Sequence, residues 1–180
     1  MILFLDTVSS LPEFFLIEDN KIVFSKKIID NCNEKMSDCI IPKYIELDTE
    51  FSLKKNLTDI IVNIGPGSYT ALRIGIAFVS GLSISQKIDL KGLSCVDLYR
   101  YCVDEKDLES SALFICSSND QNFFCLYEND KNIHKIYKVE NENNLSNLIN
   151  DKLKTIYYND KIKYKSTNLK NINYKLIKFE

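Results

Sequence analysis

The sequence has almost none of the residues from which metal and hydrolase sites are most often built. Its 180 residues contain no tryptophan and a single histidine, His134, in a polar stretch. Zinc hydrolases carry paired histidines such as HExxH, and serine or cysteine hydrolases need a histidine base, often beside a GxSxG motif. Neither motif is present. The sequence therefore argues against metal catalysis and triad hydrolysis.

The chain also lacks CxxC pairs, a charged leader and long apolar runs. Its opening Met-Ile-Leu-Phe-Leu-Asp is unlike a secretory signal, and no run approaches the roughly 18 apolar residues of a membrane helix. We expect a cytoplasmic protein with no membrane partner. In a reducing compartment its cysteines are expected to be small buried hydrophobic side chains. The six are Cys32, Cys39, Cys95, Cys102, Cys116 and Cys125.

Glycine is scarce and concentrated in one place. All five glycines of the chain fall in or just after residues 65–82, and they are Gly65, Gly67, Gly75, Gly81 and Gly92. Before them, residues 60–64 form a short β-branched run that is typical of a buried strand. The Gly-Pro-Gly that follows breaks the strand, and Ser68 is a good N-cap for a proline-free helix to residue 86. The segment predicts a strand, a sharp turn and a long helix.

This helix is apolar or small around its whole circumference. One side is formed by Ala71, Gly75, Phe78 and Leu82. The other side is formed by Thr70, Arg73, Ala77, Ser80 and Ile84, and Arg73 is the only charge. A surface helix normally carries a charged face, so we expect this one to be covered on two sides, by its own sheet and by a second helix or a second protein.

The rest of the chain alternates strands and helices, which predicts an α/β protein of two lobes, 1–103 and 104–180, separated by the polar stretch 104–111. In the first lobe we expect a helix over 35–51 with Ile41, Tyr44, Ile45 and Leu47 on its inner side and Pro42 near its start. The other predicted strands are 2–5, 14–17, 22–28, 90–93, 112–116, 122–127, 133–139, 155–158 and 174–179, with further helices at 96–103 and 145–153.

Charge is nearly balanced overall but uneven along the chain. The net charge is −2, which gives no general attraction to nucleic acid. Residues 151–180 hold eight lysines against three acidic residues. This tail is typical of a solvated surface, and contact with RNA or an acidic partner is the alternative.

Phosphate binding is the main catalytic alternative. Backbone N–H groups at the start of a helix can hold an anion, and an aspartate after a first strand can orient a metal-bound phosphate. The segment lacks GxxxxGK[ST] and GxGxxG, so a tight turn that leads into a packing helix is the competing interpretation. The candidate residues are Asp6, Thr7, Gly65, Gly67 and Ser68.

Several motifs together resemble one known family. Asp6-Thr7 follows the first strand, Ile40-Ile41-Pro42 lies in the first helix, and residues 65–75 read GPGSYTALRIG. This pattern resembles the bacterial TsaB (YeaZ) family, paralogues of the TsaD (Gcp-like) tRNA-modification enzyme, whose members typically read GPGSFTGLRIG. Gly81-Leu82 and Gly92-Leu93-Ser94 also fit. The resemblance covers about residues 1–100.

The resemblance implies an actin-like, sugar-kinase-like (ASKHA) fold with a shortened second lobe, and a non-catalytic role. Such proteins pair with a TsaD-like catalytic subunit through first-lobe helices. With a TsaE-like ATPase they support threonylcarbamoyl transfer to the adenosine beside the anticodon of ANN-decoding tRNAs. ATP and metal then belong to the partners, tRNA is contacted indirectly, and a homodimer forms when the partner is absent. The partner-binding residues it indicates are Tyr44, Tyr69, Thr70, Ala71, Arg73, Ile74, Gly75, Ala77, Phe78 and Gly81.

The chain also departs from the family pattern at four positions. Glu13 stands where a small or hydroxyl residue is common, Met36 replaces a histidine, Ala71 a glycine, and Cys116 an aspartate that opens the second lobe. Each departure removes a group that a nucleotide site could use, and Glu13 adds a carboxylate that repels phosphate. The alternative function is an autonomous nucleotide-binding kinase or ATPase of the same fold, which would depend on Asp6 and the turn at 65–68.

Overall fold

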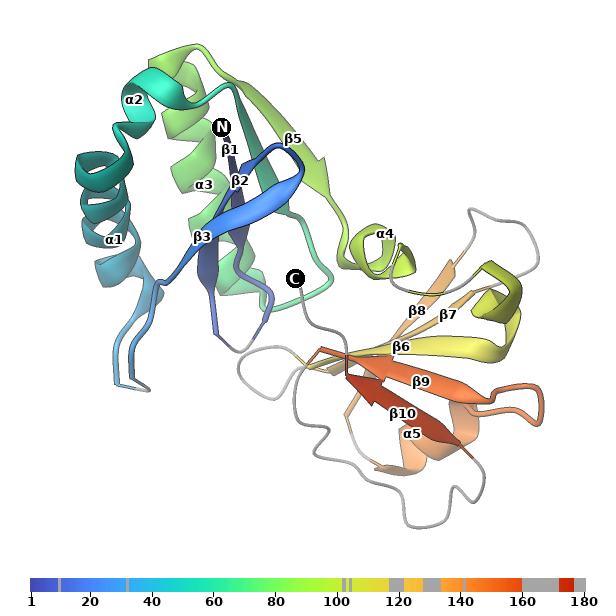
Figure 1. Cartoon of the computed structure of the whole chain (residues 1–180). Coiled ribbons are helices and arrows are strands. Elements are labelled where there is room, and N and C mark those ends of the chain that lie inside the picture. The colour runs from blue at the N-terminus through green and yellow to red at the C-terminus, as the bar shows by residue number, and fades with distance from the viewer. Residues whose placement is uncertain are drawn as a thin grey trace.

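The chain folds around two five-stranded sheets, each with helices packed on it (Figure 1). The computed structural model describes residues 1–9, 11–31, 33–101, 103, 105–116, 122–127, 134–140, 142–159 and 172–176. In the described part of the chain, no helix has the length and apolar character needed to cross a membrane.

The first sheet has the strand order β3-β2-β1-β4-β5. Its strands are β1 (Ile2–Asp6), β2 (Glu13–Glu18), β3 (Lys21–Lys27), β4 (Asp59–Asn63) and β5 (Asp89–Leu93). β1 is antiparallel to β2 and parallel to β4. Asp19 and Asn20 join β2 to β3 with positive φ angles of 50° and 61°, the backbone of a tight hairpin turn. The strands predicted at 2–5, 14–17 and 22–28 are therefore confirmed as β1, β2 and β3, and they form an antiparallel meander.

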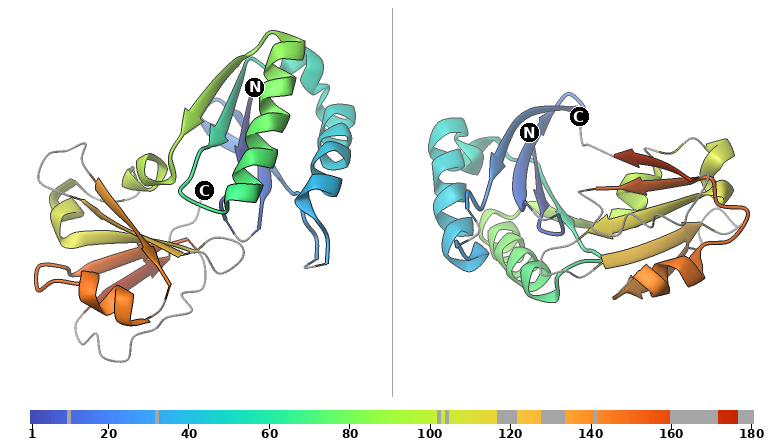
Figure 2. Two further views of the ribbon diagram at one scale, coloured as in Figure 1. Left: turned by 180° about the vertical axis from the view of Figure 1, so that it is seen from behind. Right: turned by 90° about the horizontal axis from the view of Figure 1, so that it is seen from below.

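Two long helices cover one face of this sheet (Figure 2). They are α1 (Met36–Phe51), followed by the short α2 (Leu53–Asn56), and α3 (Tyr69–Gln86). Alternate strand residues meet the helices in one apolar core, because successive side chains of a strand point to opposite faces. Its fully buried members include Leu3, Leu5, Phe14, Leu16, Ile60 and Val79.

The second sheet repeats the plan of the first, with the order β10-β9-β6-β7-β8. β6 is antiparallel to β7 and parallel to β9, as β1 is to β2 and β4. The elements of this half are η1 (Glu105–Ser110), β6 (Ser111–Cys116), β7 (Asn122–Tyr127), β8 (His134–Val139), α5 (Glu142–Leu148), β9 (Thr155–Tyr158) and β10 (Asn173–Leu176). The second half therefore begins like the first, with three strands followed by a helix.

One helix connects the two sheets. α4 (Cys95–Arg100) follows β5, and its Val96 and Tyr99 pack with Leu113 and Ile115 of the second sheet. Val8 of the first half belongs to the same buried cluster. The helix that precedes the predicted boundary at 103/104 thus contributes to the core of the second sheet.

The face of α1 that packs inward differs from the predicted one. Met36, Ile40, Tyr44 and Leu47 are buried, whereas Ile41 and Ile45 are 54% and 57% exposed. The apolar residues of this helix form two neighbouring stripes, about 100° apart, and only one of them can face the sheet. Pro42 lies in the second turn rather than near the start, and it is exposed.

Other element boundaries differ from the predictions by a few residues. The helix predicted at 96–103 ends at Arg100, and the one predicted at 145–153 begins at Glu142 and ends at Leu148. The strand predicted at 174–179 is observed at Asn173–Leu176, and residues 177–179 lie outside the described residues, as do Cys32 and Cys102.

Candidate functional site

The carboxyl ends of the parallel strands β1 and β4 bring together the polar residues predicted for a phosphate site. Asp6 ends β1 and Asn63 ends β4, and both are buried, with 2% and 1% of their surface exposed. Thr7 follows directly and is fully buried, with no hydrogen-bond partner for its Oγ1. In open α/β sheets this edge is where ligands are most often bound.

Asn63 is the centre of a hydrogen-bond network at this edge. Its Nδ2 donates to Asp6 Oδ1 at 3.0 Å, and its Oδ1 accepts from Gly65 N at 3.1 Å and from Cys95 Sγ at 3.1 Å. Val8 N donates to the same Asp6 oxygen at 2.9 Å. The network joins β1, β4, the turn and α4, so the edge is occupied by the chain's own groups.

Sequence reasoning missed Asn63 and Cys95. Asn63 is the one polar residue in the apolar run Ile60–Ile64, which directly precedes the Gly-Pro-Gly. This polar residue in an apolar strand was the only feature of the local sequence that could have identified it. Cys95 lies 32 residues further along the chain, and only the tertiary fold places its thiol beside Asn63.

Burial controls the charge state of the titratable groups in this network. Desolvation raises the pKa of Asp6 above its ordinary value, against the lowering effect of its hydrogen bonds. Burial, and then the nearby Asp6 carboxylate, raises the pKa of the Cys95 thiol well above its usual range. The Cys95 thiol therefore stays protonated and acts as a donor, not as a nucleophile.

The turn that resembled a phosphate loop is packed against its neighbours. Gly65 has φ of 99°, a conformation that favours glycine, and its carbonyl accepts from Cys95 N at 2.8 Å. A Cβ at Gly67 would lie 2.9 Å from Val8 Cγ1, so glycine is needed for this close approach. Ser68 caps α3 by accepting from Ala71 N at 3.5 Å, as predicted for a helix N-cap.

The same edge fits an anion or a divalent cation poorly. Glu13 lies opposite Asp6 in the strand register, so a second acidic residue stands at the edge where a phosphate would have to bind. Asp6 Oδ1 already accepts hydrogen bonds from Val8 N and Asn63 Nδ2. No group of three His, Cys, Asp or Glu residues that could hold a metal ion occurs among the described residues.

At the corresponding edge of the second sheet, an asparagine side chain again forms hydrogen bonds with the end of the neighbouring parallel strand. Asn159 directly follows β9, and its Oδ1 accepts from Cys116 N at 2.7 Å while its Nδ2 donates to Cys116 O at 3.0 Å. Cys116 ends β6, the strand that corresponds to β1. In both halves an asparagine amide therefore binds the end of the neighbouring parallel strand.

The α3 residues predicted to bind a partner divide between the two sides of the helix. Tyr69, Thr70, Arg73, Ala77 and Gly81 are exposed. Gly75 is buried against the first sheet, where an added Cβ would lie 2.6 Å from Thr7 Cγ2. The half-buried members are Ala71, Ile74 and Phe78.

Tyr44 joins α1 to α3 from inside the fold. It is 5% exposed, its ring centroid lies 5.4 Å from that of Phe78, and its hydroxyl accepts from Gln86 Nε2 at 3.1 Å. The two helices consequently lie side by side and start at the same end of the sheet (Figure 1).

We refer to the exposed apolar and small residues of these two adjacent helices together as the α1–α3 face. Ile84 of α3 is 79% exposed, in addition to Ile41 and Ile45 of α1. An added Cβ at Gly81 would meet nothing within 4 Å, so the space around this glycine is open. The α1–α3 face is formed by Ile41, Ile45, Arg73, Ala77, Gly81 and Ile84.

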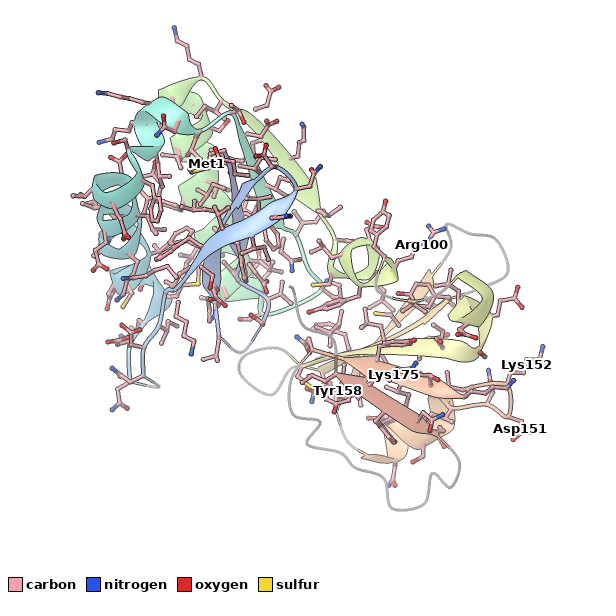
Figure 3. The ribbon with its side chains drawn as sticks, in the orientation of Figure 1. Met1, Arg100, Asp151, Lys152, Tyr158 and Lys175 are labelled. Carbon is pink, nitrogen blue, oxygen red and sulfur yellow. The ribbon has the colours of Figure 1, made fainter. Side chains whose placement is uncertain are left out.

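The lysine-rich tail is described only in part. Lys152 lies next to Asp151 at one end of the second sheet, and Lys175 lies on β10 (Figure 3). The Lys175 ammonium is 5.5 Å from the centroid of the Tyr157 ring. Residues 160–171 and 177–180 lie outside the described residues, so RNA contact by the tail stays a prediction.

Comparison with known proteins places these features in a family context. The family described as "TsaD: tRNA N6-adenosine threonylcarbamoyltransferase" matches residues 32–156. The tRNA threonylcarbamoyladenosine biosynthesis protein TsaB of Buchnera aphidicola subsp. Schizaphis graminum is 32% identical over 82 residues, which are 42% of this chain and 39% of that protein.

Two solved structures resemble the fold. YeaZ from Pseudomonas aeruginosa has a TM-score of 0.52 at 20% identity over 76% of this chain and 63% of its own. A protein of unknown function with an actin-like ATPase fold from Bacteroides thetaiotaomicron has a TM-score of 0.55 at 8% identity over 98% of this chain and 90% of its own. The chain spans less than two thirds of the length of the TsaB and YeaZ proteins. The predicted actin-like fold is confirmed.

Proposed function

The chain belongs to the TsaD family of tRNA N6-adenosine threonylcarbamoyltransferases, within its TsaB (YeaZ) group, and we propose that it acts as a non-catalytic subunit in tRNA threonylcarbamoyladenosine formation. In this role it binds a TsaD-like catalytic subunit through the α1–α3 face. The reaction supported is threonylcarbamoyl transfer to the adenosine beside the anticodon of ANN-decoding tRNAs.

The α1–α3 face is the single observation that carries the proposal. Three isoleucines on two adjacent helices are more than half exposed, and α3 has one charge in 18 residues. Soluble monomers seldom leave adjacent apolar helix surfaces open to water, and such surfaces are typical of binding sites. Helix pairing also favours small residues such as Ala77 and Gly81, because they allow backbones to approach closely.

At the carboxyl ends of the parallel strands the chain's own groups are hydrogen-bonded to each other, and this supports a non-catalytic role. In the first half Asp6 is bound by Asn63 and Val8, and in the second half Asn159 binds Cys116 at the position where the family has an aspartate. We propose that ATP and metal are held by the TsaD-like and TsaE-like partners and that tRNA is contacted indirectly. We also propose that the chain pairs with itself when the catalytic partner is absent.

Co-purification with the TsaD-like protein of the same organism tests the proposal. Wild-type chain is expected to form a complex, and Ile45→Glu and Gly81→Trp to abolish it. Both positions are exposed, and the space beside Gly81 is open, so the isolated fold should be retained. Gly75 is unsuitable for this test, because any side chain there would collide with Thr7.

Val23→Glu is the matched control. Val23 is an apolar residue of β3 with 51% exposure, away from α1 and α3. It should leave complex formation unchanged. If wild-type chain and partner do not co-purify, with or without ATP, the proposed function is wrong.

The alternative function, an autonomous kinase or ATPase, has a separate test. Calorimetry with the isolated chain at millimolar nucleotide would show binding that depends on Asp6 and the turn at 65–68. We expect no binding, because Asp6 is buried and hydrogen-bonded and Glu13 lies opposite it.

A further inference from the structure

We infer that the second half of the chain braces the start of α3, and that Val8 and Leu72 are the positioning residues through which it does so. The inference rests on the proposed function, because it concerns how the partner-binding helix is held. It gives the second half a role in partner binding that needs no contact between that half and the partner.

The start of α3 is weakly stabilised by its own sequence. Ser68 Oγ accepts from Ala71 N at 3.5 Å, which is long for an N–H···O hydrogen bond. The first turn carries no acidic residue, the charge that favours the amino end of a helix. Tyr69 and Thr70 are exposed, so they add little packing there. Contacts from elsewhere in the fold therefore decide how firmly this turn is held.

Two apolar cores hold α3 at different positions along its length. The α3 residues that pack in the core on the first sheet are Ala71, Ile74, Phe78, Val79 and Leu82. Leu72 packs instead against the cluster that contains Leu113 and Ile115 of the second sheet. It can reach this cluster because α3 starts at the end of the first sheet that is nearer to the second sheet (Figures 1 and 2). The start of α3 thus contacts both cores.

The turn before α3 is held by the same cluster of the second sheet. Val8 belongs to this cluster and is 1% exposed, and an added Cβ at Gly67 would lie 2.9 Å from its Cγ1. A Cβ at Gly65 would lie 3.1 Å from Leu72 Cδ1. Cys95, also a member, donates from its backbone N to Gly65 O at 2.8 Å. Both glycines of the turn therefore pack against residues that themselves pack with the second sheet.

The brace positions residues that are predicted to bind the partner. Tyr69 and Thr70 lie in the same turn as Leu72, and Arg73 follows directly. The Arg73 guanidinium is 5.2 Å from the centroid of the Tyr69 ring, a cation–π contact that holds the two side chains together. A surface that is ordered before binding loses less conformational entropy when the partner binds. A firmly held start of α3 therefore raises the affinity for the partner.

Leu72→Ala tests the brace on the full chain, with Leu82→Ala as the matched control. Both are half-buried leucines of α3, but Leu82 packs on the first sheet. The measurement is hydrogen exchange of the amides of residues 73–75, which bond to carbonyls of the first turn. Leu72→Ala should lower their protection at least about tenfold, because the start of α3 then opens more easily. Leu82→Ala should leave it within about twofold of wild type.

A second pair of variants places the change inside the second sheet, out of reach of a partner bound to α3. Ile115→Val removes one methyl group from the cluster that holds Leu72, and Ile156→Val removes one from the opposite side of the same sheet. Both side chains are at most 1% exposed. Ile115→Val should lower the protection of residues 73–75 at least about twofold, and Ile156→Val should leave it unchanged.

Affinity for the TsaD-like protein of the same organism, measured by calorimetry, connects the brace to partner binding. Leu72→Ala should weaken it at least about fivefold although the exposed residues of α3 are unchanged, and Leu82→Ala should stay within about twofold of wild type. Unchanged protection in Leu72→Ala, or lower protection with unchanged affinity, overturns the inference. If the wild-type chain does not bind this protein, the proposed function is wrong, and the exchange measurements alone decide whether the second half braces α3.

Discussion

The side-chain amide of Asn63 donates to the carboxylate of Asp6 over 3.0 Å, and neither side chain is exposed by more than 2%. Asp6 is the first-strand aspartate that the sequence presented as a candidate phosphate residue. In the folded chain it is part of the internal structure, since Asn63 also binds the turn and α4. The edge that carries catalysis in many α/β proteins therefore serves here to hold four segments together.

Loss of the Asn63 amide should destabilise the protein strongly. Asn63→Ala leaves Gly65 N without its side-chain acceptor, leaves the Cys95 thiol with only the longer contact of 3.7 Å to Pro66 O, and takes one donor from buried Asp6. We expect the free energy of unfolding to fall by about 2–4 kcal/mol, measured by urea denaturation. Asn56→Ala, which removes an exposed amide with one hydrogen bond to Phe51 O, should cost less than about 1 kcal/mol. Equal effects of the two substitutions would contradict the network.

Asp6 gives stability a defined pH dependence. Because burial raises its pKa in the folded state, the folded chain favours the neutral carboxyl. The contribution of Asp6 to stability is full below the unfolded-state pKa and is lost as pH rises through the folded-state pKa. Asp6→Asn stays neutral at every pH and can still accept the hydrogen bonds from Val8 N and Asn63 Nδ2.

We therefore expect Asp6→Asn to be more stable than wild type at neutral pH, by on the order of 1 kcal/mol. The advantage should shrink as pH falls into the range where the wild-type carboxyl is protonated. Thermal unfolding of both proteins across acidic to neutral pH measures this difference. A variant that loses stability at neutral pH would show that the charged carboxylate is needed, as it would be in a metal or nucleotide site.

Two glycines of α3 should respond oppositely to alanine. Gly75→Ala forces a Cβ to within 2.6 Å of Thr7 Cγ2, so the helix must move off the sheet, at a cost of about 1–3 kcal/mol. Gly81→Ala adds a Cβ in open space and removes the backbone entropy of glycine, a gain of about 0.5–1 kcal/mol. Urea denaturation of the two variants measures the change in the free energy of unfolding for each. A lower free energy of unfolding for Gly81→Ala would contradict the open space at this position.

The described cysteines should differ in reactivity. Burial raises the pKa of Cys125 to about 12 and that of Cys95 well above its usual range, and both side chains are inaccessible. Cys39 is half-buried on α1. Maleimide labelling followed by peptide mass spectrometry should modify Cys39 first and Cys95 and Cys125 only after denaturation. Rapid labelling of Cys95 in the native protein would mean that α4 opens readily.

Local patterns predicted most of the fold correctly. The strand, Gly-Pro-Gly turn and helix around residues 60–86 were recognised because each signal lies within a few residues of the structure it specifies. The strands on either side of the turn at Asp19–Asn20, and the three strands and the helix that open the second half, were recognised for the same reason.

The sequence did not predict which helix faces are buried or which distant residues come into contact. α1 carries two apolar stripes, and only packing on the sheet decides that Ile40 is buried and Ile41 exposed. Gly75 and Gly81 look alike in the sequence, yet one lies against Thr7 and the other faces open space. The contact between Asn63 and Cys95 depends on the path of α3 and β5 between them, and no local signal reports it.

The two halves share a strand plan but differ in their helices: the first sheet carries helices of 16 and 18 residues, whereas α5 on the second has seven. Because only the first half has two long helices among the described residues, the chain has one α1–α3 face there. A filament grows by head-to-tail contacts, which need two different binding surfaces on each protomer. Each added protomer then still exposes one surface that can bind the next. Under the proposed function, a chain with one such face binds one partner and cannot extend a filament.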